Sequence, residues 1–196
     1  MSAAVITYDW GMGRWEPDSR GRLRQAAFQL YAERGYDETT VAEIAERAGL
    51  TERTFFRHFA DKREVLFSGS DQLQEALVSA VAGAPDSVSP LDAVAAGLEA
   101  VAARLPDVET ARRRQAIVAT HPDLQERELI KLASMSMALA EALRGRGLAQ
   151  LPATLTAEIA MAVFRTAFER WVDKTNDRDF AQLVRESLDE LRAVTA

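Results

Sequence analysis

Apolar residues recur at helical spacing through most of the chain. Between residues 18 and 34, Leu23, Ala27 and Leu30 fall on one side of a helix, and polar residues fill the other side. The sequence lacks runs in which apolar and polar residues alternate with period two, as a half-buried strand requires. Alanine, leucine, glutamate and arginine, which are good helix formers, dominate instead. The pattern therefore predicts an all-α protein.

Capping residues and helix breakers divide this pattern into about nine helices. Thr40 and Glu43 form a capping box, in which a hydroxyl and a carboxylate three residues later satisfy free N–H groups at a helix start. Asp61 and Glu64 form a second one, and Gly35 stands where a helix commonly ends. The helices are expected at about 18–34, 41–47, 51–58, 61–81, 90–104, 108–119, 123–144, 155–174 and 179–194.

The composition is that of an ordinary soluble globular protein. The chain has 196 residues, 47% of them hydrophobic and 28% charged, which suffices for one large domain or two small ones. It contains no cysteine, so disulfides and thiolate metal sites are excluded. No apolar run reaches the ~20 residues of a membrane helix, and the first residues lack the pattern of a secretion signal. These features predict a cytoplasmic protein with no membrane partner.

The net charge of −6 argues against indiscriminate binding of nucleic acid. The charge is uneven, because residues 1–66 hold 10 Lys or Arg against 11 Asp or Glu, whereas residues 67–196 hold 14 against 19. Any DNA-binding surface must therefore be a local arrangement within the first part of the chain.

Residues 41–58 have the pattern of a helix-turn-helix, with two short helices joined by a glycine-containing turn at residues 48–50. In this motif the second helix enters the major groove of DNA. Phe55 and Phe59 lie four residues apart and therefore share a face, which we expect to pack into a small core. The other side of the second helix is then left for DNA.

That other side carries the expected DNA contacts. Arginine reads guanine edges and binds phosphate, and hydroxyls near helix N-termini add phosphate ligands. For His58, a phosphate contact and a structural role are evenly balanced. The expected DNA-binding residues are Thr40, Thr51, Arg53, Thr54, Phe56, Arg57, His58 and Lys62.

The segment LYAERGYDETTVAEIAERAGLTERTFFRHFADKREVL resembles the DNA-binding domain of TetR-family transcriptional regulators. The resemblance covers about residues 20–66 and rests on Gly35, the start at Thr40, the turn in IAERAGL, the aromatic-rich TFFRHF and Lys62. It implies nine helices, DNA binding through the first three, and a ligand pocket and dimer contacts in the C-terminal ones. Phe56 departs from the family, in which a tyrosine is common, so one hydroxyl contact with phosphate is lost while the ring can still pack on the DNA backbone.

The motif and the resemblance together predict three parts: an N-terminal arm at 1–17, a helix-turn-helix domain at 18–66, and a ligand-binding and dimerisation domain at 67–196. The expected function is that of a ligand-responsive repressor. It binds a pseudo-palindromic operator as a homodimer, and a small-molecule effector releases it. The alternative is a helical protein that binds a small molecule or a partner and no DNA, which the acidic charge slightly favours.

Two groups of apolar residues are candidates for the ligand pocket and the subunit interface. Methionines suit an adaptable pocket, although at helical spacing they more often form plain core. The last helix is amphipathic and too short to be stable alone, so we expect it to pair with its equivalent in the partner. The expected pocket residues are Met135, Met137, Met161, Phe164 and Phe168, and the expected interface residues are Ile159, Val163, Ala167, Phe180, Leu183, Val184, Leu188 and Leu191.

No catalytic or metal site emerges from the sequence. With two histidines and no cysteine, a multi-histidine metal site and the usual nucleophile arrangements find no support, and no glycine-rich phosphate loop is present. We expect no enzymatic activity and no cofactor. The basic run at 112–114 is expected to be a solvated face, and His121 a capping or loop residue.

Overall fold

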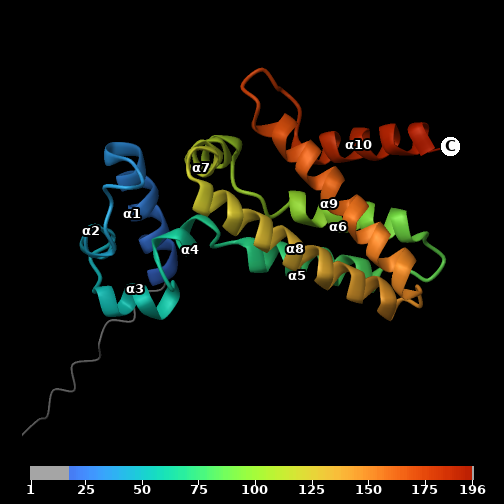
Figure 1. Ribbon diagram of the computed structural model, residues 1–196, viewed down its shortest axis with the longest axis horizontal. Helices are drawn as coiled ribbons and strands as arrows, with labels where there is room; N and C mark the ends of the chain where they lie inside the picture. The colour runs from blue at the N-terminus through green and yellow to red at the C-terminus, as the bar shows by residue number, and fades with distance from the viewer. Residues whose placement is uncertain (1–17, 196) are drawn as a thin grey trace, which may run out of the picture. The chain divides into compact units, whose positions relative to one another are not determined.

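The computed structural model describes residues 18–195, which form ten helices and no strand (Figure 1). The all-α prediction is confirmed, whereas the predicted N-terminal arm lies outside the described residues. The chain divides into two compact units between Val65 and Leu66. The helices are α1 Ser19–Arg34, α2 Val41–Arg47, α3 Glu52–His58, α4 Lys62–Leu66, α5 Ser70–Gly83, α6 Pro90–Ala102, α7 Val108–Thr120, α8 Pro122–Gly145, α9 Gln150–Val172 and α10 Phe180–Thr195.

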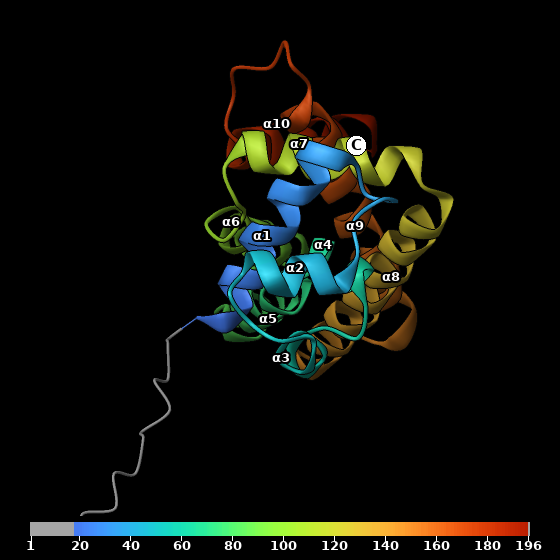
Figure 2. The same ribbon diagram turned by 90° about the vertical axis from the view of Figure 1, so that its left-hand side faces the viewer.

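The first unit packs α1, α2 and α3 against one another (Figure 2). Asp18 caps α1 by accepting a hydrogen bond from a backbone N–H of the first turn at 2.8 Å. Gly35 ends the helix with a φ of 87°, which favours glycine. One large buried side chain from each helix, Leu23, Ile44 and Phe55, forms the centre of the unit. The unit is small, so these apolar anchors determine how α3 is held.

The second unit is a bundle in which α8 and α9 lie side by side, with α5 against α8 and α10 against both α9 and α6 (Figure 1). Leu98, Leu139 and Ala157 are fully buried at its centre. Aromatic rings fill the space between α9 and α10, where the Phe180 ring centroid lies 5.6 Å from that of Phe164 and 5.7 Å from that of Trp171.

The helix that we expected to run unbroken from residue 61 to 81 consists of two helices. The backbone N–H groups of Gly69 and Ser70 both donate to the Phe67 carbonyl, at 2.9 and 3.1 Å, and the Ser70 hydroxyl donates to it at 2.8 Å. These bonds replace the helical pattern and make a turn between α4 and α5. The described chain therefore has ten helices where nine were expected.

We expected the basic run in α7 to be a solvated face. In the structure, two of its arginines instead make structural contacts. Arg112 donates to the carbonyls of Val172 and Asp173, at 3.0 and 2.7 Å. Arg114 donates to the Leu66 carbonyl at 2.9 Å and forms an ion pair with Glu128 at 2.8 Å. Both guanidinium groups therefore fasten chain segments that leave α4 and α9.

The prediction that the stripe of α10 forms the subunit interface does not agree with the structure. Its apolar side chains are covered by α6 and α9 of the same chain, because the amphipathic face of α10 completes the core of its own unit. Of the residues predicted at the interface, only Ile159 is exposed and Leu191 is half-buried. The buried ones are Val163, Ala167, Phe180, Leu183, Val184 and Leu188.

The predicted pocket residues separate into two groups. Met135, Met161 and Phe164 are buried and Phe168 is half-buried, all of them within the packed core of the second unit. Met137 is 68% exposed on the opposite side of α8, because it lies two residues from Met135 and helical neighbours at that spacing point apart. It cannot share an internal pocket with the others. Across the described residues, no helix is both long and apolar enough to cross a bilayer.

Candidate nucleic-acid interface

The start of α2 is held by the predicted capping box. The Thr40 hydroxyl accepts a hydrogen bond from the Glu43 N–H at 3.2 Å, and the Glu43 carboxylate accepts one from the Thr40 N–H at 2.9 Å. Glu43 also forms an ion pair with Arg34 of α1 at 2.6 Å. Thr40 therefore has a capping role that fixes where α2 begins relative to α1.

The turn between α2 and α3 needs a glycine. Gly49 has a φ of 65°, and a Cβ atom there would lie 2.9 Å from the Arg22 guanidinium. Arg22 in turn donates to the Ala48 carbonyl, so α1 holds the turn from the other side. Thr51 then caps α3 by accepting a hydrogen bond from the Thr54 N–H at 3.2 Å.

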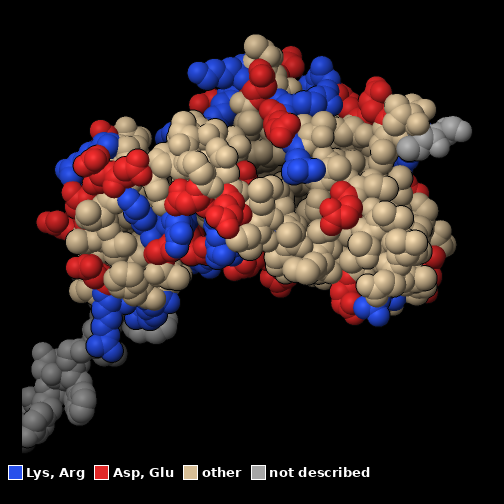
Figure 3. All heavy atoms as spheres, in the orientation of Figure 1, with Lys and Arg blue, Asp and Glu red and all other residues tan. Residues whose placement is uncertain are grey.

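The two faces of α3 differ as predicted from their spacing. Phe55 is fully buried and its ring centroid lies 5.5 Å from that of Phe59, which anchors the helix. Arg53 and Arg57 are exposed on the outer side, and the Phe56 ring is 55% exposed. Figure 3 shows Lys and Arg side chains on the surface over α3. An exposed aromatic ring on the same face as two exposed arginines is suited to a sugar–phosphate backbone.

The arginines of α3 differ in their ion pairing from Arg34 of α1 and Arg47 of α2. Arg34 and Arg47 are each paired with a carboxylate, at 2.6 and 2.8 Å. Hydrogen bonds from Thr40, and after them the charge of Arg34, lower the pKa of Glu43, and the hydrogen bond from Arg47 lowers the pKa of Glu33. Within residues 18–195, neither Arg53 nor Arg57 forms an ion pair with a carboxylate. No carboxylate of the described chain therefore neutralises the positive charge of α3.

His58 lies at the end of α3 beside Arg57, with 3.5 Å between the Arg57 guanidinium and the His58 Nε2 atom. Partial burial lowers the pKa of His58, and the charges of Arg57 and Arg20 lower it further. Arg20 is an exposed residue of α1 that sequence reasoning missed, and its guanidinium lies 5.6 Å from the Phe59 ring centroid. The two arginines are 37 positions apart in the sequence, so no local pattern signals that Arg20 joins this basic surface.

Lys62 differs from the other predicted DNA contacts. Its ammonium group donates to the carbonyls of Tyr36, Asp37 and Thr39, at 2.9, 3.0 and 3.0 Å. An ammonium has three protons, so all of its donors are used inside the unit. The prediction that Lys62 binds phosphate therefore conflicts with the position of its side chain.

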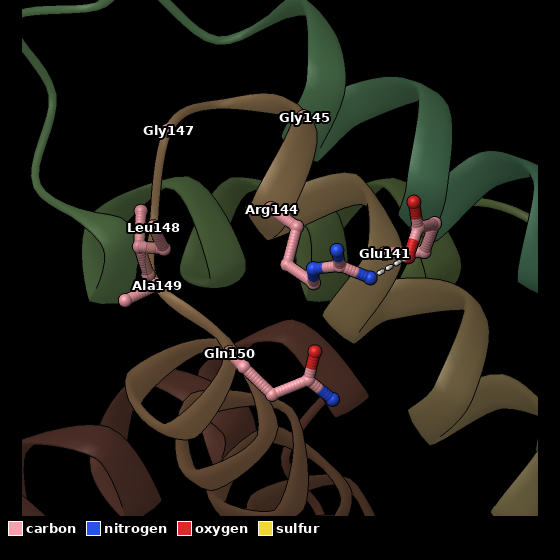
Figure 4. Close-up of a pocket in the computed structure, with 7 residues that line it drawn as sticks. All are labelled: Glu141, Arg144, Gly145, Gly147, Leu148, Ala149 and Gln150. Carbon is pink, nitrogen blue, oxygen red and sulfur yellow. Dashed lines mark hydrogen bonds and ion pairs between the residues drawn. The ribbon is translucent and has the colours of Figure 1, made fainter.

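The second unit has an open surface depression at the turn between α8 and α9. Figure 4 shows Glu141 and Arg144 at the end of α8 and Gln150 at the start of α9, with the first two joined by an ion pair of 2.8 Å. A neighbouring groove between the same helices includes Met137, but none of the other predicted pocket residues. No group of three side chains that could hold a metal ion occurs in the part of the chain that the structure describes.

Two family matches cover most of the chain. Residues 23–68 match the family described as bacterial regulatory proteins, tetR family. Residues 88–196, which are more than half of the chain, match the family described as MftR C-terminal domain. The first match ends at residue 68, close to the division between the two units after Val65, and the second begins at residue 88.

The sequence relatives each match less than half of the chain. The transcriptional regulator TcmR of Streptomyces glaucescens is 38% identical over 91 residues, which are 46% of this chain and 40% of TcmR. The transcriptional activator FasR of Mycolicibacterium smegmatis is 34% identical over 64 residues, which are 33% of this chain and 29% of FasR. The matched region thus spans less than half of the length of each of these relatives.

Solved structures share the fold over nearly the whole chain. A complex of SmeT with triclosan has a TM-score of 0.64 and 20% sequence identity, and the match covers 89% of this chain and 90% of SmeT. A TetR-family regulator from Mesorhizobium loti has a TM-score of 0.56 and 22% identity, with 89% of this chain and 95% of that one covered. With the helix-turn-helix geometry and the two family matches, these findings show that the chain belongs to the TetR family of DNA-binding transcriptional regulators, with an MftR-type C-terminal domain.

Proposed function

We propose that this regulator is a repressor that binds a pseudo-palindromic operator as a homodimer and leaves it when a small molecule binds the second unit. One observation carries the proposal. The buried face of α3 is anchored by Phe55 and Phe59, while Arg53, Phe56 and Arg57 stand exposed on its other side without carboxylate partners among the described residues. A rigid helix with such a free basic face fits the major groove.

Within this proposal the residues of α3 have distinct tasks. Arg53 and Arg57 bind guanine edges or phosphates, and the Phe56 ring packs on the sugar–phosphate backbone. Thr54 and Thr51 share a hydrogen bond of 3.1 Å between their hydroxyls, and both can also reach phosphate at the start of α3. A regulator that works in this way acts on chromosomal DNA, which places it in the cytoplasm.

The proposed dimer requires a surface that the single chain leaves uncovered. Within residues 18–194, six of the eight large apolar side chains that stand exposed lie on α8 and α9, and they define what we call the α8–α9 face. Figure 3 shows few charged side chains over these two helices. The members of the face are Leu129, Ile130, Met137, Leu151, Leu155 and Ile159.

The size and the charges of the α8–α9 face suit a second copy of this chain. Helices of 24 and 23 residues are each about 35 Å long, so together they offer roughly 700 Å², near the ~800 Å² per partner of a stable interface. Glu158 and Arg165 are exposed seven residues apart on α9, with exposed Ala162 between them. A two-fold axis near Ala162 brings each charge to its opposite in the partner, and alanine allows close approach of the helices.

The dimer proposal is tested by placing charge in the centre of the face. Leu155→Glu with Ile159→Glu should convert the protein to a monomer in sedimentation experiments, because two carboxylates from each copy would be buried without partners. Val194→Glu is the matched control, since Val194 is 78% exposed on α10, outside the face. A double variant that remains dimeric at micromolar concentration would remove the α8–α9 face from the proposal.

We propose that the effector is an apolar small molecule that binds the second unit. Met135, Met161, Phe164 and Phe168 belong to the core of the second unit, and Phe164 and Phe168 contact the Phe180 ring of α10. Methionine side chains adapt to ligands of different shape. SmeT, which shares the fold, has been solved with triclosan and is described as the repressor of a multidrug efflux pump. FasR is described as an activator, so the repressor assignment needs a transcription assay of its own.

A further inference from the structure

The Lys62 ammonium occupies a closed set of acceptors at the start of α4. Three carbonyls from the loop between α1 and α2 accept its hydrogen bonds at 2.9 to 3.0 Å. The same nitrogen lies 4.5 Å from the Tyr36 ring centroid, which adds a cation–π contact. Carbonyls and an aromatic face together replace the water that surrounds an exposed lysine.

Lys62 is also held through its backbone. The Tyr31 hydroxyl donates to the Lys62 carbonyl at 2.9 Å, and the Tyr31 and Tyr36 rings lie edge to face with 5.3 Å between centroids. Tyr31 belongs to α1, Tyr36 to the loop and Lys62 to α4, so the three side chains connect three parts of the first unit. Both ends of Lys62 are therefore fixed to elements that precede the helix-turn-helix.

The loop that Lys62 binds leads directly to the start of α2. The Thr39 side chain is buried, and its hydroxyl donates to the Gly35 carbonyl at 2.8 Å. Thr40 follows at once and caps α2. Because α2 packs against α3, the position of this loop determines how the helix that reads DNA is presented.

From these contacts we infer that Lys62 is a positioning residue, which clamps residues 36–39 so that α2 and α3 are set for DNA, and that it is not a phosphate ligand. The inference rests on the proposed DNA reading by α3 for its consequence, but the clamp itself is a property of the free protein. It separates Lys62 from Arg53 and Arg57, which act by touching DNA.

The geometry of the site calls for lysine in particular. An ammonium directs three donors toward three converging carbonyls, whereas the guanidinium of arginine is planar and suits paired acceptors in one plane. Lys62→Arg keeps the charge and loses this fit. A phosphate ligand, in contrast, tolerates the change, since arginine binds phosphate at least as well.

Hydrogen exchange of the free protein tests the clamp without DNA. In Lys62→Met and in Lys62→Arg, the backbone amides of Thr39 and Thr40 should exchange about tenfold faster or more, because a hydrogen bond from a charged group contributes at least that factor to local stability. Arg57→Ala is the control, since Arg57 is exposed and does not touch the loop. Unchanged exchange in both Lys62 variants would overturn the inference, whatever is found with DNA.

DNA binding supplies the second readout, with a duplex selected by the wild-type protein as the probe. Both Lys62 variants should lose affinity while the slope of log K against log salt stays that of wild type. Arg57→Ala should make that negative slope less steep by about 0.9, which is the effect of losing one phosphate contact. Two results would overturn the positioning role. One is wild-type affinity in Lys62→Arg, and the other is a less steep salt slope in Lys62→Met. If the wild-type protein selects no DNA at all, the proposed function fails. Hydrogen exchange of the free protein still tests whether Lys62 holds residues 36–39 in place.

Discussion

At the scale of single residues, we expect His58 to give DNA binding a pH dependence if its ring faces phosphate. Its pKa in the free protein is lowered by partial burial, by Arg57 and by Arg20, so the ring is neutral at neutral pH. A nearby phosphate favours the charged ring and raises the pKa in the complex. Binding then takes up a proton, so DNA affinity should rise as the pH falls from about 8 toward about 6. It should level off below the pKa that His58 has in the free protein.

The matched variant is His58→Gln, which keeps a polar side chain and cannot be protonated. Its affinity at constant salt should be the same across that pH range, apart from effects shared with every variant. If wild type and His58→Gln have the same pH dependence, His58 does not face phosphate and its role is structural.

Residue types and spacing predicted the two faces of α3, because the spacing of four between Phe55 and Phe59 leaves the arginines on the other side. Residue types and spacing did not predict the contacts of the Lys62 side chain. A lysine shortly after the motif looks the same in sequence whether it faces phosphate or binds carbonyls 23 to 26 residues earlier. Only the fold brings that loop to the ammonium.

At the scale of elements, the turn between α2 and α3 depends on Gly49. Gly49→Ala forces a side chain into a left-handed conformation beside the Arg22 guanidinium, which should lower the free energy of unfolding by about 1–2 kcal/mol. DNA affinity should fall as well, because the turn sets the angle of α3. Thermal unfolding and a DNA titration measure the two effects.

Gly83→Ala is the control for that substitution. A Cβ atom at Gly83 meets nothing within 4 Å, and the residue ends α5 without a positive φ. Its stability should be unchanged or slightly higher, since alanine favours helix more than glycine does. If Gly49→Ala is as stable as Gly83→Ala, the turn does not need a glycine.

Most element boundaries followed from caps, because capping is local. The exceptions have identifiable reasons. The break at Phe67–Ser70 is made by a small Ser-Gly-Ser segment between two helix-favouring stretches, and its hydrogen bonds to Phe67 are not visible in an apolar pattern. α9 starts at Gln150, earlier than expected, because Pro152 lies in the first turn, where a missing N–H removes no helical bond.

At the scale of the whole molecule, periodicity predicted that α10 must dock on something but not on what. An apolar stripe has the same pattern whether its own chain or a partner covers it. In the structure α6 and α9 cover it, and the exposed apolar side chains of the second unit are concentrated on α8 and α9. The alternative of a helical binding protein without DNA binding is removed by the family assignment.

The most direct test of a dimeric DNA reader is selection of bound sequences from random duplex DNA by the purified protein at moderate, fixed salt. The account predicts enrichment of one inverted repeat, with half-sites about one helical turn apart or a multiple of it. Arg53→Ala with Arg57→Ala should abolish the enrichment while the dimer persists. Enrichment of a single half-site, or of no sequence by a folded dimer, would contradict the account.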